Sequence, residues 1–384
     1  MFNFINIVEF LFKKCGDIMN KLEEAREIIN TVDAEMAALF EKRMKASEMV
    51  AEYKRENGLS ILDTSREAEI IKKNSEYIED KAIREYYVEF LKDTMSISRA
   101  YQSRLNEGVR VAYNGVPGAY AYIASKKLFP EGTPVSYNDF VSAYEAVEKG
   151  ECDVAVLPIE NSYAGDVGTV MDLIFAGSLY VNQVIDLPII HNLIAPRGAT
   201  LQSIKKVVSH PQALSQCADF IKKHGYESEA FSNTAVSAQY VKEQNDITIG
   251  AIASDETASI FGLEILESNI NTSRSNTTRF AVFSRAQNNM SDSKSKMNDH
   301  FILTFTVKNE AGALAKTLDI IGAHGFNMRN LRSRPMKELL WSYYFYIEAD
   351  GNINTRDGKE MLRILGATCD KLKLAGTYKT QDIK

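Results

Sequence analysis

The hydrophobic positions near the start of the chain recur at the spacing of a helix. Between about Lys21 and Leu105 there is no proline and a single glycine, Gly58, while apolar residues return every three or four positions. This spacing is typical of amphipathic helices, and the first uninterrupted stretch predicts an unusually long one. We therefore expect an all-helical domain over residues 19–106, and the length of its apolar stripe favours dimerisation.

A different pattern begins at Val109. Short β-rich runs such as VRVAY, DVAVLP and RFAVFS alternate with helical stretches and with Gly or Pro turns. This alternation predicts an α/β domain with a mostly parallel sheet over residues 108–285. The polar stretch 286–299 is typical of a linker. Residues 300–380 then follow the order strand, helix, strand, strand, helix, strand, which predicts a small ferredoxin-like α+β domain.

Composition and charge narrow the class of protein. The 384 residues are 45% hydrophobic and 25% charged, with a net charge of -6. A mildly acidic surface argues against nucleic-acid and anionic membrane partners, so an anionic small molecule must meet local clusters of Arg and Lys. The 4 cysteines are far apart and form no CxxC pair, which argues against a zinc site or a disulfide framework. We expect no metal and no cofactor.

No segment predicts export or a membrane span. In the opening run MFNFINIVEFLF the charges of Lys13 and Lys14 follow the apolar residues instead of preceding them, and no small-residue cleavage site is present. The apolar stretch from Leu173 to Ala195 is interrupted by asparagine, aspartate and proline. We expect a cytoplasmic protein in which the opening run is a short extension or precedes a translation start at Met19.

Polar residues of the helical region share helix faces. At 100° per residue, Arg43 and Lys54 lie about 20° from eclipsed and roughly 16 Å apart along one helix. Two long cationic side chains at this separation can converge on a small dianion. Further polar residues are spaced to share one face of a second and of a third helix, namely Asp63, Arg66 and Glu67, and Ser98 with Gln102.

These residues lie in segments that resemble the helical chorismate mutase family: EAREIINTVDAEMAALFEKR, AEYKRE, ILDTSREAEI and SRAYQ. The resemblance implies a chorismate site with Arg43 and Arg66 on the carboxylates, Arg26 from the partner protomer, Lys54 and Gln102 on the ether oxygen, Glu67 on the hydroxyl, and Asp63 and Ser98 lining the site. The implied reaction is a pericyclic rearrangement that needs no nucleophile, metal or redox centre. Lys54 and Gln102 are the implied catalytic residues, since both stabilise negative charge on oxygen without a proton transfer.

Short motifs mark strand ends and helix starts in the α/β region, namely GVPGAY, PIENS, SHPQALSQC and NTTRF. Helix starts offer free amides to a carboxylate, and ligands of open α/β sheets lie at the carboxyl ends of strands. In this order the motifs resemble the prephenate dehydratase family, which folds as two α/β lobes around a cleft, similar to periplasmic ligand-binding proteins. A further segment, Asn233–Ala235, matches the family's smaller Thr-Ala motif.

The resemblance implies a prephenate cleft lined by Asn161, Ser162, Ser209, Gln216, Thr278 and Arg279. The implied reaction expels a ring hydroxyl as water while a carboxylate leaves as carbon dioxide, so it needs a proton donor near that hydroxyl. We expect the Thr278 hydroxyl to be this general acid. The chain departs from the family at Ala121, where a hydroxyl residue is common. His210 beside Ser209 lacks the G-x-S-x-G elbow of a hydrolase, so no catalytic triad is expected.

The third region contains GALAKTLDIIGAHG and NLRSRP. These segments resemble the ACT regulatory domain attached to prephenate dehydratases, in which GAL and ESRP segments bind phenylalanine between paired domains. The resemblance implies an allosteric phenylalanine site formed by Gly312, Ala313, Leu314, Ser333, Arg334 and Pro335. Gly312 would let the ligand backbone approach, and helix amides would meet its carboxylate. Arg332 stands where the family usually has Glu, so we expect an altered affinity for phenylalanine.

Together the regions predict a bifunctional enzyme of phenylalanine biosynthesis. It would convert chorismate to prephenate and prephenate to phenylpyruvate, would be inhibited by phenylalanine, and would form a homodimer or homotetramer. One alternative is a two-lobed solute sensor with a helical dimerisation arm, and another is a dehydratase whose helical domain has become a scaffold. The ordered charged residues of the helical region argue against both alternatives, and the TRF motif argues against the first.

Overall fold

The computed structural model describes residues 2–273, 275–288, 299–336 and 342–379, with side chains from residue 21 onward. The chain divides into two compact units, Met1–Asn106 and Glu107–Lys384. None of the helices in the described part of the chain combines the length and the apolar character that a membrane span requires.

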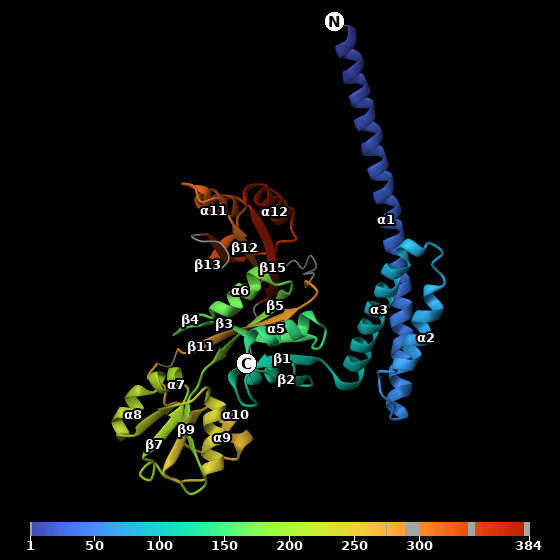
Figure 1. The fold of residues 1–384 in the computed structure, drawn as a ribbon. Coiled ribbons are helices and arrows are strands. Elements are labelled where there is room, and N and C mark those ends of the chain that lie inside the picture. The colour runs from blue at the N-terminus through green and yellow to red at the C-terminus, as the bar shows by residue number, and fades with distance from the viewer. Residues whose placement is uncertain (1, 274, 289–298, 337–341, 380–384) are drawn as a thin grey trace. The chain divides into compact units, whose positions relative to one another are not determined.

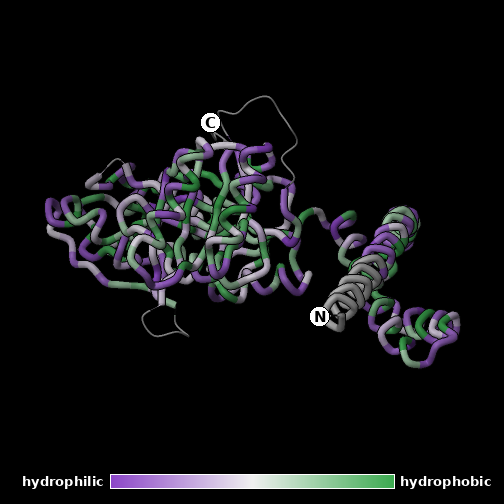
Figure 2. The backbone as a smooth tube through the Cα atoms, turned by 90° about the horizontal axis from the view of Figure 1, so that it is seen from above, coloured by the Kyte–Doolittle hydropathy of each residue, from purple (hydrophilic) through white to green (hydrophobic). Residues whose placement is uncertain are grey.

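The first unit is helical, which confirms the prediction for this region. It consists of α1 (Phe2–Glu56), α2 (Thr64–Ser75) and α3 (Lys81–Glu107). In Figure 1 the N-terminal half of α1 extends past both other helices, and α3 lies along its C-terminal half. Figure 2 shows hydrophobic and hydrophilic residues mixed along the coloured parts of this unit. Mostly small or polar residues are buried where α1 meets α3, namely Ser47, Ala51, Thr94 and Ser98, together with Met95.

The second unit begins with an α/β lobe, here called lobe 1. Its elements are β1 (Arg110–Asn114), α4 (Tyr120–Leu128), β2 (Thr133–Tyr137), α5 (Phe140–Glu148), β3 (Val154–Asn161), β4 (Gly165–Asp166), α6 (Gly168–Ala176), β5 (Tyr180–Pro188) and β11 (Thr277–Ser284). The strands β2, β1 and β3 pair in parallel, whereas β11 is antiparallel to both of its neighbours, β3 and β5. The predicted mostly parallel sheet is therefore mixed, because β5 leads out to the other lobe and β11 returns from it.

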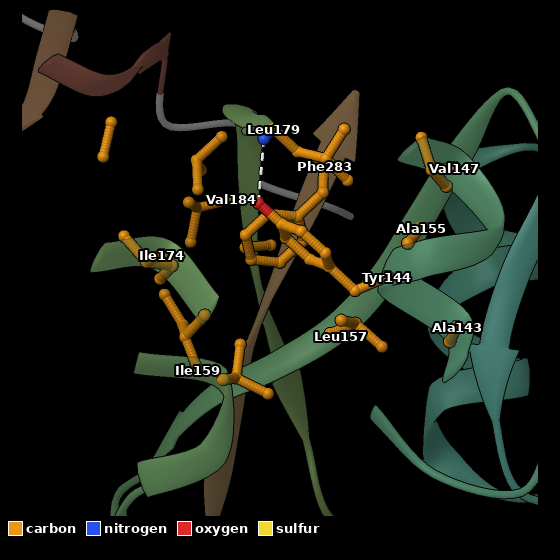
Figure 3. Packing of buried hydrophobic residues seen from close by; sticks show 14 of the residues in the cluster. Ala143, Tyr144, Val147, Ala155, Leu157, Ile159, Ile174, Leu179, Val184 and Phe283 are labelled. Carbon is orange, nitrogen blue, oxygen red and sulfur yellow. Dashed lines mark hydrogen bonds between the residues drawn. The ribbon is translucent and has the colours of Figure 1, made fainter. Parts of the chain in front are cut away.

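Helices cover both faces of the lobe 1 sheet. On the face of α5 and α6, Tyr144 packs with Leu157 and Phe283, and its hydroxyl accepts a 2.8 Å hydrogen bond from the N–H of Leu179 (Figure 3). On the opposite face α4 packs over a second apolar cluster that includes Phe280. This two-sided core holds β3 and β11, the strands that carry the PIENS and TRF motifs.

Two crossing segments, residues 189–191 and 268–276, connect lobe 1 with lobe 2. Lobe 2 consists of β6 (Asn192–Ala195), β7 (Lys206–Ser209), α7 (Pro211–Gln216), α8 (Ala218–His224), β8 (Glu227–Ala230), α9 (Thr234–Gln244), β9 (Ile249–Ala253), α10 (Asp255–Phe261) and β10 (Glu264–Glu267). Its strand order is β10-β6-β9-β7-β8. The predicted two-lobed α/β arrangement is confirmed.

The C-terminal region follows the predicted order of strands and helices. Its elements are β12 (Asp299–Thr306), α11 (Ala313–Ala323), β13 (Asn327–Pro335), β14 (Tyr343–Asp350), α12 (Arg356–Thr368) and β15 (Lys371–Lys379). The antiparallel order is β13-β14-β12-β15. α11 and α12 pack on one face, and on the other Phe175 of α6 stacks on Tyr344 at 4.2 Å between ring centroids.

The C-terminal sheet is continuous with the sheet of lobe 1, because β15 pairs with β5 where Gly376 faces Val181. A Cβ on Gly376 would lie 2.1 Å from the carbonyl oxygen of Val181, so only glycine permits this approach. The pattern of the sequence suggested a region set apart by a linker over 286–299, most of which lies outside the described residues.

Candidate active sites

A cavity of about 290 Å³, here called the interlobe cavity, is lined by residues of lobe 1, lobe 2 and the crossing segments. The end of β3 brings Asn161 to it, the start of β11 brings Thr278, and the end of α7 brings Gln216. Half of the residues predicted for prephenate thus meet here. The rest of the lining consists of Asn114, Ala119, Tyr120, Ala121, Phe140, Pro158, Val167, Ile189, His191, His210, Gln212, Ala213, Asn233, Thr234 and Phe280.

Hydrogen bonds join the polar groups of the interlobe cavity into one network. The Nδ2 of Asn161 donates to Oγ1 of Thr278 at 2.9 Å and to Oδ1 of Asn276 at 3.0 Å. The Nδ2 of Asn276 donates to Oε1 of Gln216 at 2.9 Å, and Nε2 of His191 lies 2.8 Å from the same oxygen. The network therefore runs from the TRF strand of lobe 1 to α7 of lobe 2.

The two histidines of the interlobe cavity favour the neutral form. Burial lowers the pKa of both His191 and His210 below the ordinary value. The Nδ1 of His210 accepts a hydrogen bond from the N–H of Gln212 at 3.2 Å, as a helix cap does. The hydroxyl of Ser209 donates to the carbonyl of Ile252 at 2.6 Å. Ser209 and His210 therefore do not form the nucleophile–base pair of a hydrolase.

The described lining of the interlobe cavity includes no lysine or arginine, so an anionic ligand would have to bind neutral donors. Instead α4, α6 and α9 begin there, with Ala119, Val167 and Thr234 in the lining. The first amides of a helix have no partner within the helix and carry partial positive charge. A carboxylate can therefore bind here without the local Arg and Lys cluster that the composition suggested.

The other residues predicted for prephenate lie elsewhere. Ser162 accepts a 3.0 Å hydrogen bond from the N–H of Thr277, and so joins β3 to β11. Ser209 is fully buried beneath the cavity lining. Arg279 points to the opposite face of the sheet from Thr278, because neighbouring side chains alternate along a strand. The expectation that these three side chains line the cleft does not match their positions.

Arg279 forms a buried ion pair with the C-terminal region. Its guanidinium donates two 2.8 Å hydrogen bonds to the carboxylate of Glu348 on β14, and one of 3.1 Å to the hydroxyl of Tyr378 on β15. Burial by itself would raise the pKa of Glu348, but the hydrogen bonds from Arg279 outweigh it and lower that pKa. Arg279 thus ties the strand of Thr278 to the C-terminal sheet.

Two arginines of the NLRSRP segment also face lobe 1. Arg332 donates to Glu160 at 2.6 Å, and Arg334 donates to Asp172 of α6 at 3.0 Å. The segment therefore divides between two sides of β13, since side chains alternate along the strand. The exposed side holds the remaining predicted residues of this segment, Ser333 and Pro335.

The predicted GAL residues surround the start of α11. Gly312 has the left-handed φ of 84° that glycine tolerates best, and Ala313 is the first helical residue. Leu314 lines a cavity of about 420 Å³ together with Tyr343 and Phe345. An apolar ligand side chain could be accommodated beside this helix start.

The helical unit holds two cations that have only neutral partners. The guanidinium of Arg43 on α1 donates to the hydroxyl of Ser98 and, at 3.3 Å, to the carbonyl of Thr94 on α3. The Nζ of Lys54 donates to the carbonyl of Ile61 at 2.6 Å. Within the described residues no carboxylate lies at ion-pair distance from either cation. Both are therefore available to an anionic ligand.

Two further predicted chorismate residues, Gln102 and Arg66, lie on α3 and α2. Gln102 is buried on α3, and its Oε1 has no hydrogen-bond partner among the described residues. Arg66 lines a cavity of about 310 Å³ with Arg43, and it pairs with Glu69 at 2.7 Å on the surface. The cavity brings together the two arginines that were predicted to hold carboxylates.

The remaining predicted chorismate residues have other partners or lie far away. Glu67 pairs with Arg99, and Asp63 accepts a hydrogen bond from the N–H at the first turn of α2. Arg26 is exposed on α1, about 26 Å along the helix from Arg43 at 1.5 Å per residue. Arg26 and Arg43 of one chain therefore cannot hold the same small ligand.

Several residues of the interlobe cavity and of its hydrogen-bond network were not among the predicted site residues. Asn276 and Tyr120 lie within the NTTRF and GVPGAY motifs, so the motifs themselves were a usable signal. His191 lies in a crossing segment outside every motif. No spacing rule links it to Gln216, because only the fold of the crossing segments brings them together.

Known families match both units of the chain. The model of the prephenate dehydratase family matches residues 111–288, and that of chorismate mutase type II matches residues 25–103. A bifunctional chorismate mutase/prephenate dehydratase of Neisseria gonorrhoeae is 29% identical, over 92% of this chain and 96% of that protein. An arogenate dehydratase/prephenate dehydratase of Arabidopsis thaliana is 32% identical, over 70% of this chain and 72% of that protein.

A solved structure has the same fold over most of the second unit. It is the prephenate dehydratase of Arthrobacter aurescens in complex with L-Phe, with a TM-score of 0.65 and 27% identity, over 71% of this chain and 90% of that one. The matches thus cover the helical unit, the two lobes and the order in which they follow each other. The chain belongs to the family of bifunctional chorismate mutase/prephenate dehydratases.

Proposed function

We propose that the interlobe cavity converts prephenate to phenylpyruvate with Thr278 as the proton donor. The observation that carries this proposal is the 2.9 Å hydrogen bond from Nδ2 of Asn161 to Oγ1 of Thr278. A hydroxyl has one proton and two lone pairs, and Oγ1 uses a lone pair here, so the proton remains for the ligand. The Asn161 donor also stabilises the negative charge that develops on Oγ1 when the proton leaves.

The proton would pass to the ring hydroxyl, which departs as water. The bond from the ring to its carboxylate breaks, its electron pair enters the ring, and carbon dioxide leaves. That carboxylate loses its charge during the step, so a paired guanidinium would stabilise the ground state more than the transition state. A cavity without Arg or Lys in its lining, with Arg279 turned away, suits this requirement.

The helical unit would rearrange chorismate to prephenate. Arg43 and Arg66 would hold the carboxylates, and Lys54 with Gln102 would stabilise the charge on the ether oxygen. The cations of Arg43 and Lys54, which meet only neutral partners among the described residues, support this assignment.

The mutase site would be completed by a second copy of the chain. Arg26 lies too far from Arg43 to act within one chain, and exposed apolar residues follow α1 around it. Apolar surface of this extent on a helix favours a partner. The residues are 43% to 65% exposed: Ile28, Ile29, Val32, Met36, Leu39 and Phe40.

The C-terminal region would be a ferredoxin-like ACT domain over residues 300–380 that binds phenylalanine and inhibits the dehydratase. The βαββαβ order, the left-handed Gly312 and the cavity beside Leu314 support this assignment. The relative from Arthrobacter aurescens was solved with L-Phe bound.

The test is an assay of the purified full chain with chorismate or prephenate as substrate and phenylpyruvate as product, with and without phenylalanine. Product from both substrates, suppressed by phenylalanine, is the expected result. Product from prephenate alone would contradict the mutase assignment. Absence of product from either substrate would contradict the enzyme assignment and favour a solute sensor.

A further inference from the structure

The orientation of one amide in the interlobe cavity is set by the backbone. The Oδ1 of Asn161 accepts hydrogen bonds from the N–H of Tyr163 at 3.0 Å and of Ala164 at 2.9 Å. A backbone N–H can only donate, so Oδ1 must occupy this side of the amide. Nδ2 therefore faces Asn276 and Thr278.

This orientation passes along the network from one amide to the next. Because Asn161 presents a donor, Asn276 must present Oδ1 to it and Nδ2 to Gln216. Gln216 must in turn present Oε1, and the Nε2 of His191, 2.8 Å from that oxygen, must carry the proton. The network thus sets the tautomer of His191 as well as the amide orientations.

One donor remains at the end of this network. The Gln216 side chain is 6% exposed and lines the interlobe cavity, and its Nε2 has no hydrogen-bond partner among the described residues. An unpaired buried N–H costs free energy that a ligand oxygen would recover. Two donors on Oε1, from His191 and Asn276, prevent the amide from turning over and presenting its oxygen to the cavity.

We propose that His191 and Asn276 are positioning residues of the dehydratase, which hold the Gln216 amide so that Nε2 donates a hydrogen bond to a carboxylate or ketone oxygen of the substrate. This inference rests on the proposed dehydratase function. Without these donors the amide has two orientations of similar energy, and in one of them its oxygen faces an anionic ligand. His191 also lines the cavity, but its Nε2–H points to Oε1 of Gln216, so the donor of this ring serves that amide and not a ligand.

The test compares substitutions of His191 that differ in where they place an N–H. Glutamine places its amide nitrogen near the position of Nε2, whereas asparagine places it near Nδ1, and methionine has no donor. We expect H191Q to stay within about 3-fold of the wild-type kcat/KM on prephenate, and H191N and H191M to lose about 10- to 100-fold, mostly through KM, because a buried hydrogen bond is lost. Equal activities of H191Q, H191N and H191M would overturn the proposal, as would a loss in H191Q as large as that in H191M.

A double-mutant cycle separates positioning from a general structural effect. With Q216M as background, H191M should cause little further loss of kcat/KM, because the amide that His191 orients is already absent. Additive losses would overturn the proposal. Melting temperatures of all variants report on folding. Absence of prephenate turnover by the wild-type chain would instead contradict the dehydratase assignment itself.

Discussion

At the scale of single residues, alternation along β11 separates the roles of the TRF motif. Thr278 and Phe280 line the interlobe cavity, whereas Arg279 between them faces the C-terminal region. Residues one apart on a strand point to opposite faces, so three consecutive motif residues serve two surfaces. The motif therefore links a proposed catalytic hydroxyl to a buried ion pair on the other side of the sheet.

The hydroxyl of Thr278 can be tested with two substitutions that separate it from the neighbouring methyl group. Thr278→Ser keeps the hydroxyl, and we expect kcat on prephenate to stay within about 10-fold of wild type. Thr278→Val replaces the hydroxyl by a methyl group, and we expect kcat to fall about 10²- to 10⁴-fold, the range typical of general acid catalysis. Turnover of chorismate by the same variants is the control, and comparable kcat values on prephenate for the Ser and Val variants would contradict the donor role.

At the scale of elements, arginines connect β11 and β13 with their neighbours. Glu160 of the PIENS motif lies 2.6 Å from Arg332 and 3.5 Å from Arg279, so it stands between two cations. A glutamate at position 332 would place two carboxylates together in this position. The positive charge of Arg332 is therefore matched by two carboxylates of lobe 1, Glu160 and Asp166.

The buried pair of Arg279 and Glu348 predicts a large effect of charge removal. Glu348→Gln removes the carboxylate that accepts both 2.8 Å hydrogen bonds from Arg279, while Glu160 and Asp186 remain 3.5 Å from the guanidinium, so we expect the free energy of unfolding to fall by about 1–3 kcal/mol. Glu360→Gln is the matched control, because Glu360 pairs with Arg363 at 2.7 Å on the surface, where ion pairs contribute little. Denaturant unfolding measures both, and an equal effect of the two substitutions would contradict the prediction.

The same pair predicts how stability depends on pH. The pKa of Glu348 is lowered from its ordinary value of 4.5, so the unfolded state binds this proton at a higher pH than the folded state. The stabilising contribution is therefore complete above 4.5 and is lost as pH falls through the folded-state pKa. We expect the melting temperature of Glu348→Gln to fall less steeply than that of the wild type below this pH, and parallel curves would contradict the assignment.

At the scale of the whole molecule, the exposed apolar side of α1 and the position of Arg26 both point to a dimer. In the proposed dimer, each mutase site needs Arg43 from one chain and Arg26 from the other. Within one chain α1 separates the two residues by about 26 Å, so they cannot meet at one ligand there.

Co-expression of two inactive chains tests this arrangement. R26A and R43A should each lose most mutase activity, and a mixed dimer should contain one intact site and one doubly altered site. Random pairing of equal amounts would then restore about a quarter of the sites. Measured mutase activity should rise accordingly, while prephenate turnover stays unchanged in all samples. Full activity of R26A alone, or no recovery in the mixture, would contradict the shared site.

The sequence by itself determined the features that depend on local pattern. Helical spacing without proline predicts α1 from about Lys21 onward, α2 and α3, and the alternation of strand and helix signals predicts both lobes and the order of elements in the C-terminal region. The motifs also located Asn161, Gln216 and Thr278, because each lies at the end of a strand or helix that the pattern reveals.

Tertiary structure alone decided which faces and partners these residues have. A strand pattern does not state which neighbour covers each face, so the pairing of Arg279 with Glu348 and the burial of Ser209 were not predictable. His191 meets Gln216 only because a crossing segment passes beside α7. The junction of β15 with β5 depends on Gly376, whose missing side chain matters only where another backbone approaches. Contacts between distant segments depend on the packing of the whole chain, which no local spacing records.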